Sequence, residues 1–310
     1  MDKLQKILSL VEEYAEENLL KNKWDRGDWV NYSGPHFSAD EFRVAAEALL
    51  GGWLVFGKKA REFEQIFPQH LGKNFGMLTN SGSSANLIMT QALTSKKSFM
   101  KKYFLPKGSK IITPVVCFPT TLNPIIQTGF QPVFVDVDLP SLNLNLDQVE
   151  KLLKEDSSIR GIVFAHVLGN PPDMDRFMHL VEKYNLIFLE DSCDALGSFY
   201  DGKKLGSFGH MSSCSFYPAH HMTLKNGKER INYDHRYVFD EIGFNLKPLE
   251  LQAAIGLEQL NKLPQMDTAR RKNFDAYTRI FSKYEDYFIL PKATDKSDPN
   301  WFGYLLTVKE

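Results

Sequence analysis

Two adjacent histidines, His220 and His221, stand in the most unusual segment of the 310-residue chain, Ser215–Thr223, which follows an apolar stretch. Histidine can transfer a proton near neutral pH or bind a metal ion. Neighbouring side chains on an extended chain point in opposite directions, so at most one of the pair is expected to face a given site. A metal-binding pair is therefore not favoured, and one packed plus one solvated histidine is the alternative interpretation.

Three acids and a thiol, Glu190, Asp191, Cys193 and Asp194, follow an apolar run. At the end of a strand such a cluster could bind a metal ion, a ribose or a protonated heterocycle, or it could simply solvate a loop. Cys193 could be a metal or cluster ligand, but a single cysteine is more often a small buried apolar residue. No CxxC spacing accompanies it.

A third candidate segment, Asn80–Ala85, combines Gly82 with the hydroxyl residues Ser81, Ser83 and Ser84 directly before a predicted helix. Free N–H groups and hydroxyls at a helix N-terminus bind anions, and the helix dipole adds to the attraction. The alternative is an ordinary N-cap followed by a flexible turn.

Alternating apolar runs and helical stretches must position these residues. Strands are predicted from runs rich in Val, Ile and Phe, at Lys110–Val116, Pro132–Val137, Gly161–Val167 and Leu186–Leu189. Helices are predicted between them, at Ser84–Leu93, Asp147–Lys154 and Met174–Tyr184. This alternation is typical of an α/β fold with a mainly parallel sheet covered on both faces. Ligands bind such sheets beyond the carboxyl ends of the strands, where the polar clusters of this sequence fall.

The two ends of the chain are expected to be mainly helical. Apolar residues at helical spacing predict an amphipathic helix over Asp2–Lys23, and two further helices over Glu250–Leu263 and Asn273–Tyr284. Asp298–Lys309 is predicted to be the first strand of another unit, which stops abruptly. We expect a helical arm at residues 1–30, a large domain at 31–260, and the start of a small, incomplete C-terminal domain at 261–310.

Composition excludes several classes of protein. The net charge is -1, with 37 basic and 38 acidic side chains and no basic patch interleaved with aromatics, so a nucleic-acid partner is not expected. No apolar run reaches the roughly 20 residues that span a bilayer. The three widely spaced cysteines form no disulfide framework, which favours a reducing cytoplasm.

Seven segments, taken in order, resemble the DegT/DnrJ/EryC/StrS-type family of pyridoxal-phosphate sugar aminotransferases and dehydratases. The resemblance runs from about Gly34 to the end and implies the type I aminotransferase fold. The segments are Gly57–Glu64, Asn80–Asn86, Phe118–Ile126, Pro132–Asp138, Glu190–Ser198, Ser215–Thr223 and Gly243–Leu260.

The resemblance implies a role for most of the candidate residues. The cofactor phosphate would be bound by Gly82, Ser83, Ser84 and Ser215. Asn245 and Lys247 would reach the phosphate of a neighbouring subunit, which implies a homodimer. Phe118 would lie against the pyridine ring, and Asp191 would pair with the protonated ring nitrogen. Asp194 and Tyr217 would line the cofactor near His220.

Within the family, FPTT, EDSCDALGS and SFYPAHH are most similar to the iron–sulfur dehydratases that act at C3 of CDP-4-keto-6-deoxyglucose in 3,6-dideoxyhexose and lipopolysaccharide O-antigen biosynthesis. His220 stands where the aminotransferases carry their cofactor-binding lysine. Lysine bonds covalently to the cofactor aldehyde and imidazole cannot, which favours pyridoxamine phosphate over pyridoxal phosphate. His220 is expected to remove a proton from the cofactor's C4′ carbon while the C3 hydroxyl leaves as water.

The sequence departs from this branch after Leu224, where some dozens of residues of the family pattern are absent. They are either truly deleted or dropped from the sequence. Cys193 matches one ligand of the expected 2Fe–2S cluster, which normally takes four protein ligands, but its three partners would lie in the absent part. A cluster would also require a separate flavin or iron–sulfur reductase as partner.

Three other interpretations stay open. The chain could be a sugar-nucleotide aminotransferase, which His220 disfavours. It could be a cluster-free dehydratase that regenerates its cofactor from glutamate. It could also be an inactive scaffold protein without cofactor, which binding of pyridoxamine phosphate would argue against.

Overall fold

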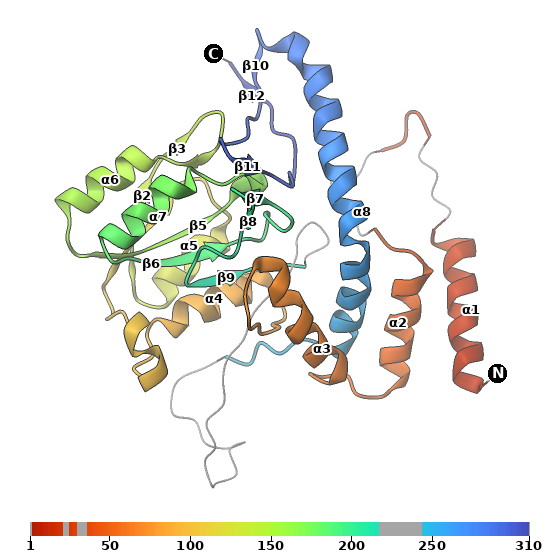
Figure 1. The fold of residues 1–310 in the computed structure, drawn as a ribbon. Coiled ribbons are helices and arrows are strands. Elements are labelled where there is room, and N and C mark those ends of the chain that lie inside the picture. Colours follow the sequence, from red (N-terminus) through yellow and green to blue (C-terminus); the bar gives the residue numbers. More distant parts are fainter. Residues whose placement is uncertain (1, 21–24, 30–35, 217–243, 310) are drawn as a thin grey trace.

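The computed structural model describes residues 2–20, 25–29, 36–216 and 244–309, which form a central sheet with helices around it (Figure 1). The segment with Tyr217, His220 and the sequence departure after Leu224 therefore lies outside the described residues. Among the residues that are described, no helix is both long enough and apolar enough to cross a membrane.

Five parallel strands form the central sheet in the order β2-β1-β5-β6-β9. Their bounds are β1 Lys110–Pro114, β2 Gln131–Val135, β5 Ile159–Ala165, β6 Ile187–Asp191 and β9 Met211–Ser213. The four predicted strands are confirmed within a few residues at each end. The short fifth strand, β9, was not predicted.

Helices cover both faces of this sheet, which is why its strands are apolar on both sides. On one face α6 (Leu146–Glu155) and α7 (Met174–Lys183) pack against Phe164 and Phe188. On the other face α4 (Gly82–Ala92) and α5 (Pro119–Gln127) pack against Val163 and Leu189. The predicted α/β class, with the layered parallel sheet, is confirmed.

A third layer is made only of helices and lies beside the sheet (Figure 1). It contains α1 (Lys3–Asn18), α2 (Ala39–Leu50), α3 (Lys58–Ile66) and α8 (Glu250–Phe281), with α8 packed against α2 and α3. Glu250, at the start of α8, accepts the backbone N–H groups of Gly57, Lys59 and Ala60 and so caps α3 from outside that helix. Two segments almost 200 residues apart are thereby fixed to one another.

The prediction of two helices after residue 249 is wrong, because α8 is one helix of 32 residues with Pro264 inside it. Proline removes one helical hydrogen bond, and tertiary contacts hold the helix on both sides of it. Leu263 packs in one cluster with Ala60 and Phe63 of α3, and Arg271 pairs with Asp298 at 3.1 Å. The predicted domain boundary at residues 260–261 falls inside α8, and the division into domains stays a prediction.

The single strand predicted over Asp298–Lys309 is also wrong. Two short strands occur instead, and they pair with different partners: β11 (Ser297–Asp298) with β7 (Phe199–Tyr200), and β12 (Thr307–Val308) with β10 (Phe288–Ile289). The remaining short elements are β3 Val137–Asp138, β4 Asn143–Leu144, β8 Lys203–Lys204, η1 Phe67–Leu71, η2 Ser98–Tyr103, η3 Val167–Gly169 and η5 Ser282–Tyr284.

Candidate functional site

The last two residues of β6, Glu190 and Asp191, are neighbouring buried acids that point to opposite faces of the sheet. Glu190 faces the same side as Phe188. Its carboxylate accepts His166 Nε2 at 2.9 Å and the N–H groups of Gly206 and Gly209 at 2.6 Å each. Burial would raise the pKa of Glu190, but these hydrogen bonds outweigh it and hold the pKa below its usual value. Glu190 is therefore a structural acid that ties the 206–209 loop to the sheet.

Asp191 faces the side covered by α4 and α5. Oδ2 accepts hydrogen bonds from Asn86 Nδ2 and Thr121 Oγ1, both at 2.8 Å. Oδ1 accepts a hydrogen bond from the backbone N–H of Cys193 at 3.1 Å. The residue is 3% exposed. A buried carboxylate held in this way at the carboxyl edge of a sheet suits a protonated ring nitrogen, one of the options left open by the sequence.

The start of α4 lies close to this carboxylate. Ser81 caps the helix by accepting the N–H of Ser84 at 3.1 Å, and Ser83 Oγ donates to Thr120 Oγ1 at the start of α5 at 3.2 Å. The cap provided by Ser81 supports the N-cap interpretation of this segment, and it does not exclude the anion site. The N–H groups of the first helical turn remain the natural place for a phosphate.

Gly82 allows this helix end to approach the strand-end loops. A Cβ at this position would lie 2.5 Å from Ser215 Cβ and 3.2 Å from Cys193 Sγ. No side chain fits in that space, so the residue must be glycine for the α4 N-terminus and Ser215 to meet. The structure thus brings together the predicted phosphate-binding residues Gly82, Ser83, Ser84 and Ser215.

Two other predicted regions lie at the same edge. Phe118 is the N-cap of α5 and is 65% exposed, which leaves its ring available to a planar ligand. Leu246 accepts the backbone N–H of Asn80 at 2.9 Å, so the segment with Asn245 and Lys247 runs beside the α4 N-terminus of its own chain. Asn245 and Lys247 are both exposed.

Asp194 follows the same strand, and its Oδ2 accepts the backbone N–H of Leu168 at 3.4 Å. How Tyr217 and His220 lie relative to Asp194 falls outside the described residues. Three residues that contact the site were not predicted, namely Asn86, Thr121 and Ser213. Asn86 and Thr121 stand within the quoted segments, but their spacing alone carries no signal of a shared partner.

The three cysteines all lie in surroundings that raise their pKa values. Burial, followed by the negative charge of Asp191, raises the pKa of Cys193 well above its usual value and also raises the pKa of Cys117. Burial likewise raises the pKa of Cys214. The part of the chain that the structure covers holds no group of three His, Cys, Asp or Glu side chains placed for a metal ion. The described residues by themselves therefore do not fit a 2Fe–2S cluster, which normally takes four protein ligands.

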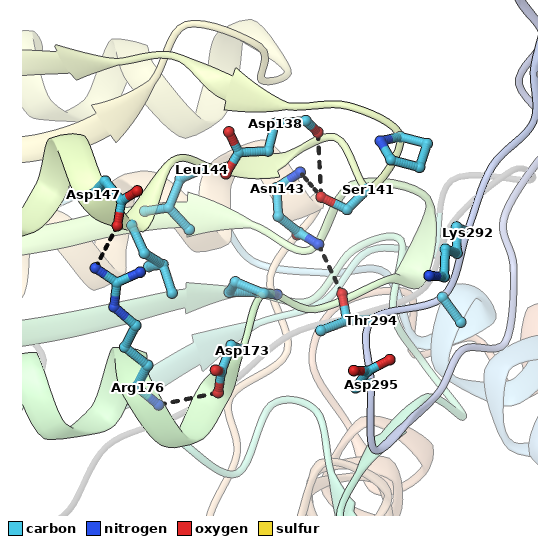
Figure 2. A pocket seen from close by; sticks show the side chains of 14 residues that line it. Asp138, Ser141, Asn143, Leu144, Asp147, Asp173, Arg176, Lys292, Thr294 and Asp295 are labelled. Atoms are coloured by element: carbon cyan, nitrogen blue, oxygen red, sulfur yellow. Dashed lines mark hydrogen bonds and ion pairs between the residues drawn. The ribbon is translucent and has the colours of Figure 1, made fainter.

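A separate cavity of about 330 Å³ lies between the β3–β4 hairpin, the start of α7 and residues 292–295. Figure 2 shows the side chains that line it. None of the predicted site residues lines it. Arg176, which lines this cavity, pairs with Asp147 at 2.6 Å and also with Glu150 at 3.0 Å. The charged lining consists of Asp138, Asp147, Asp173, Asp295, Arg176 and Lys292. Because acids outnumber bases here, this cavity does not favour a phosphate.

A parallel sheet, a helix N-terminus beside its carboxyl edge and a buried aspartate at that edge are together the features of an aminotransferase-like fold of type I. The profile of the DegT/DnrJ/EryC1/StrS aminotransferase family matches residues 35–228 and 225–310. The chain belongs to this family. The two matched parts meet within the segment after Leu224 where the sequence departs from the family pattern.

Two relatives align with nearly the whole chain. It is 36% identical to the lipopolysaccharide biosynthesis protein RfbH of Salmonella typhimurium, over 99% of this chain and 79% of that protein. It is 34% identical to the dTDP-4-dehydro-2,6-dideoxy-D-glucose 3-dehydratase of Saccharopolyspora spinosa, over 99% and 75%.

A solved structure of the E. coli GDP-4-keto-6-deoxy-D-mannose-3-dehydratase with bound hydrated PLP superposes with a TM-score of 0.81 at 27% identity, over 91% of this chain and 80% of that one. The family and its type I fold are therefore shown for this chain.

Proposed function

We propose that the protein removes the C3 hydroxyl, as water, from a nucleotide-linked 4-keto-6-deoxyhexose with pyridoxamine phosphate as cofactor. The single observation that carries the proposal is His220, which stands where the aminotransferases of the family carry lysine. An imidazole cannot bond covalently to the cofactor aldehyde, so it favours dehydration over amino transfer. The relatives named as 3-dehydratases support the same choice.

The cofactor would be held by the residues that the fold brings to one edge of the sheet. Gly82, Ser83, Ser84 and Ser215 would bind the phosphate, and Asp191 would pair with the ring nitrogen, which keeps the ring positively charged. When bound, the cofactor supplies an amine for the C4 ketone and an electron sink. Phe118 would cover one face of the ring.

His220 would act as the base that takes a proton from the C4′ carbon of the cofactor, because the pKa of imidazole lies near neutral pH. Asp194 and Tyr217 would line the cofactor beside it. The lost hydroxyl leaves C3 as water, with no outside oxidant or reductant needed for that step.

A homodimer with shared sites forms part of the proposal. Asn245 and Lys247 are exposed, next to the α4 N-terminus, and would contact the phosphate bound by the neighbouring subunit. The proposal contains no iron–sulfur step, because the described residues do not fit a cluster. A reductase partner is consequently left out of the proposed reaction.

The proposal also specifies the nucleotide of the substrate and the biological context of the reaction. We infer a CDP-sugar from the resemblance of the active-site segments, whereas the relatives include enzymes named for dTDP- and GDP-sugars. The name of the 36% identical relative supports a place in lipopolysaccharide biosynthesis, and we place the protein in the cytoplasm.

The test is to incubate the protein with pyridoxamine phosphate and a CDP-4-keto-6-deoxyhexose in labelled water, and to follow the sugar by mass spectrometry. Loss of water, or exchange of the C3 oxygen, is expected, and both should vanish in His220→Asn. The dTDP- and GDP-linked sugars run in parallel decide the nucleotide. Transfer of an amino group to the sugar would overturn the proposal in favour of an aminotransferase, and failure to bind the cofactor would favour an inactive protein.

A further inference from the structure

The carboxylate of Asp191 has two differently occupied oxygens. Oδ2 accepts two side-chain hydrogen bonds, from Asn86 Nδ2 and Thr121 Oγ1, each at 2.8 Å. Oδ1 accepts one, from the backbone N–H of Cys193 at 3.1 Å. A carboxylate oxygen offers two lone-pair positions. Oδ2 is thus fully used by two side-chain donors, so Oδ1 is the oxygen that a ligand nitrogen would approach. The thiol of Cys193 also lies within hydrogen-bond reach of this carboxylate.

Asn86 is itself held in one orientation. Ser213 Oγ, at the end of β9, donates to Asn86 Oδ1 at 2.5 Å, so the amide nitrogen is the end that faces Asp191. Asn86, Thr121 and Ser213 are 2%, 0% and 1% exposed. Because water does not reach them, no solvent molecule can take over a lost hydrogen bond without a rearrangement of the core.

These contacts join four elements at one carboxylate. Asn86 comes from α4, Thr121 from α5 and Ser213 from β9, and Asp191 ends β6. The side chain of Asp191 has little freedom to rotate, since rotation would break both hydrogen bonds to Oδ2. Oδ1 therefore points in a defined direction.

We infer that Asn86, oriented by Ser213 and aided by Thr121, is a positioning residue that directs Oδ1 of Asp191 at the ring nitrogen of the cofactor. The inference rests on the proposed function, because it takes Asp191 as the partner of that nitrogen. It adds a residue whose part is to aim the carboxylate rather than to touch the cofactor. A correctly aimed carboxylate keeps the proton on the ring nitrogen, and the proton makes the ring an electron sink.

The test uses pyridoxamine phosphate with nitrogen-15 in its ring, bound to the full-length protein. The nitrogen-15 chemical shift reports whether the ring nitrogen carries its proton, and a fluorescence titration gives the dissociation constant. In Asn86→Ala the signal is expected to move toward the unprotonated position and the affinity to fall about tenfold, the effect of one lost hydrogen bond to a charged group. Thr121→Val should change both in the same direction by less.

Thr90→Val is the matched control. Thr90 lies one turn further along α4, is 1% exposed, and donates its hydroxyl hydrogen to the backbone oxygen of Asn86 at 2.8 Å without touching Asp191. The variant Thr90→Val removes a buried hydrogen bond from the same helix, so it should lower the melting temperature about as much as Asn86→Ala does. The nitrogen-15 signal should stay at its wild-type position.

The variant Asp191→Asn distinguishes failure of the proposed pairing with the ring nitrogen from failure of the positioning role of Asn86. If Asp191→Asn leaves the ring signal unchanged, Asp191 is not the ring partner and that part of the proposed function fails. If Asp191→Asn removes the proton but Asn86→Ala behaves as wild type, the positioning role is overturned and the proposed function stands. Should Asn86→Ala not fold, Ser213→Ala decides instead. It keeps Asn86 and removes only its orienting donor, and an unchanged signal there would equally overturn the inference.

Discussion

Replacing Glu190 by glutamine tests the structural role assigned to this acid, independently of any cofactor. Each oxygen of the Glu190 carboxylate accepts a glycine N–H at 2.6 Å, from Gly206 at Oε1 and from Gly209 at Oε2. The amide of glutamine has one oxygen, so in either orientation its NH2 group faces a backbone N–H. One buried donor is then left without an acceptor, and His166 loses a charged partner.

The magnitude follows from the burial of the pair. Glu190 and His166 are both 0% exposed. A buried backbone donor left without an acceptor costs about 1–3 kcal/mol of unfolding free energy. For a chain of this length about 2 °C of melting temperature corresponds to each kcal/mol, so Tm should fall by about 2–6 °C.

The effect should depend on pH in one direction. Because the pKa of Glu190 is lowered by folding, its stabilising contribution is fully present above the unfolded pKa of about 4.3 and is lost as pH falls through the folded value. The difference in Tm between wild type and Glu190→Gln should therefore be constant between about pH 5 and 8, and shrink below about pH 4.

The assay is thermal unfolding followed by circular dichroism across this pH range. Glu62→Gln is the matched control, since Glu62 is 42% exposed and pairs with Lys59 at 3.3 Å on the surface. It should change stability by no more than about 0.5 kcal/mol. A Tm for Glu190→Gln within a degree of wild type at pH 7 would refute the structural assignment.

Three further outcomes are expected. His220→Lys with pyridoxal phosphate should give an adduct that borohydride traps and mass spectrometry detects, whereas wild type gives none; no adduct in the variant would show that His220 is misplaced. Gly82→Ala should weaken pyridoxamine-phosphate binding by about tenfold, because its Cβ would lie 2.5 Å from Ser215 Cβ, while Gly303→Ala, whose Cβ would meet only Leu168 at 3.6 Å, should bind as wild type. Glu250→Ala should cost about 1–2 kcal/mol in denaturant unfolding through the lost cap of α3, and an unchanged midpoint would contradict that capping role.

The strands were predictable because the sheet is covered on both faces. Runs such as Ile111–Ile112 and Ile162–Phe164 are buried on both sides, so each run is continuously apolar and stands out in the sequence. The strand β9 has only three residues, Met-Ser-Ser, and two of them are polar. Its hydroxyls are used by Asn86 and by Gly206, which apolar patterning cannot reveal.

The site could be predicted as a set of segments but not as a set of contacts. Phosphate-binding residues lie close in sequence around Gly82, so their types and their place before a helix were sufficient. The residues that hold Asp191 come from positions 70 and 105 residues away, and nothing in their local sequence links them. Likewise, the fusion of two predicted helices into α8 depends on tertiary contacts around Pro264 that a local pattern does not contain.

The two adjacent acids of β6 restrict insertions and deletions in this strand. Since side chains alternate along a strand, inserting or deleting a single residue before Glu190 would exchange the two carboxylates between the faces of the sheet. The acid that holds the 206–209 loop would then stand among Asn86 and Thr121, and the loop amides would lose their acceptor. Length variation among natural or engineered variants should therefore be absent from Ile187–Asp191 and confined to the loops on either side.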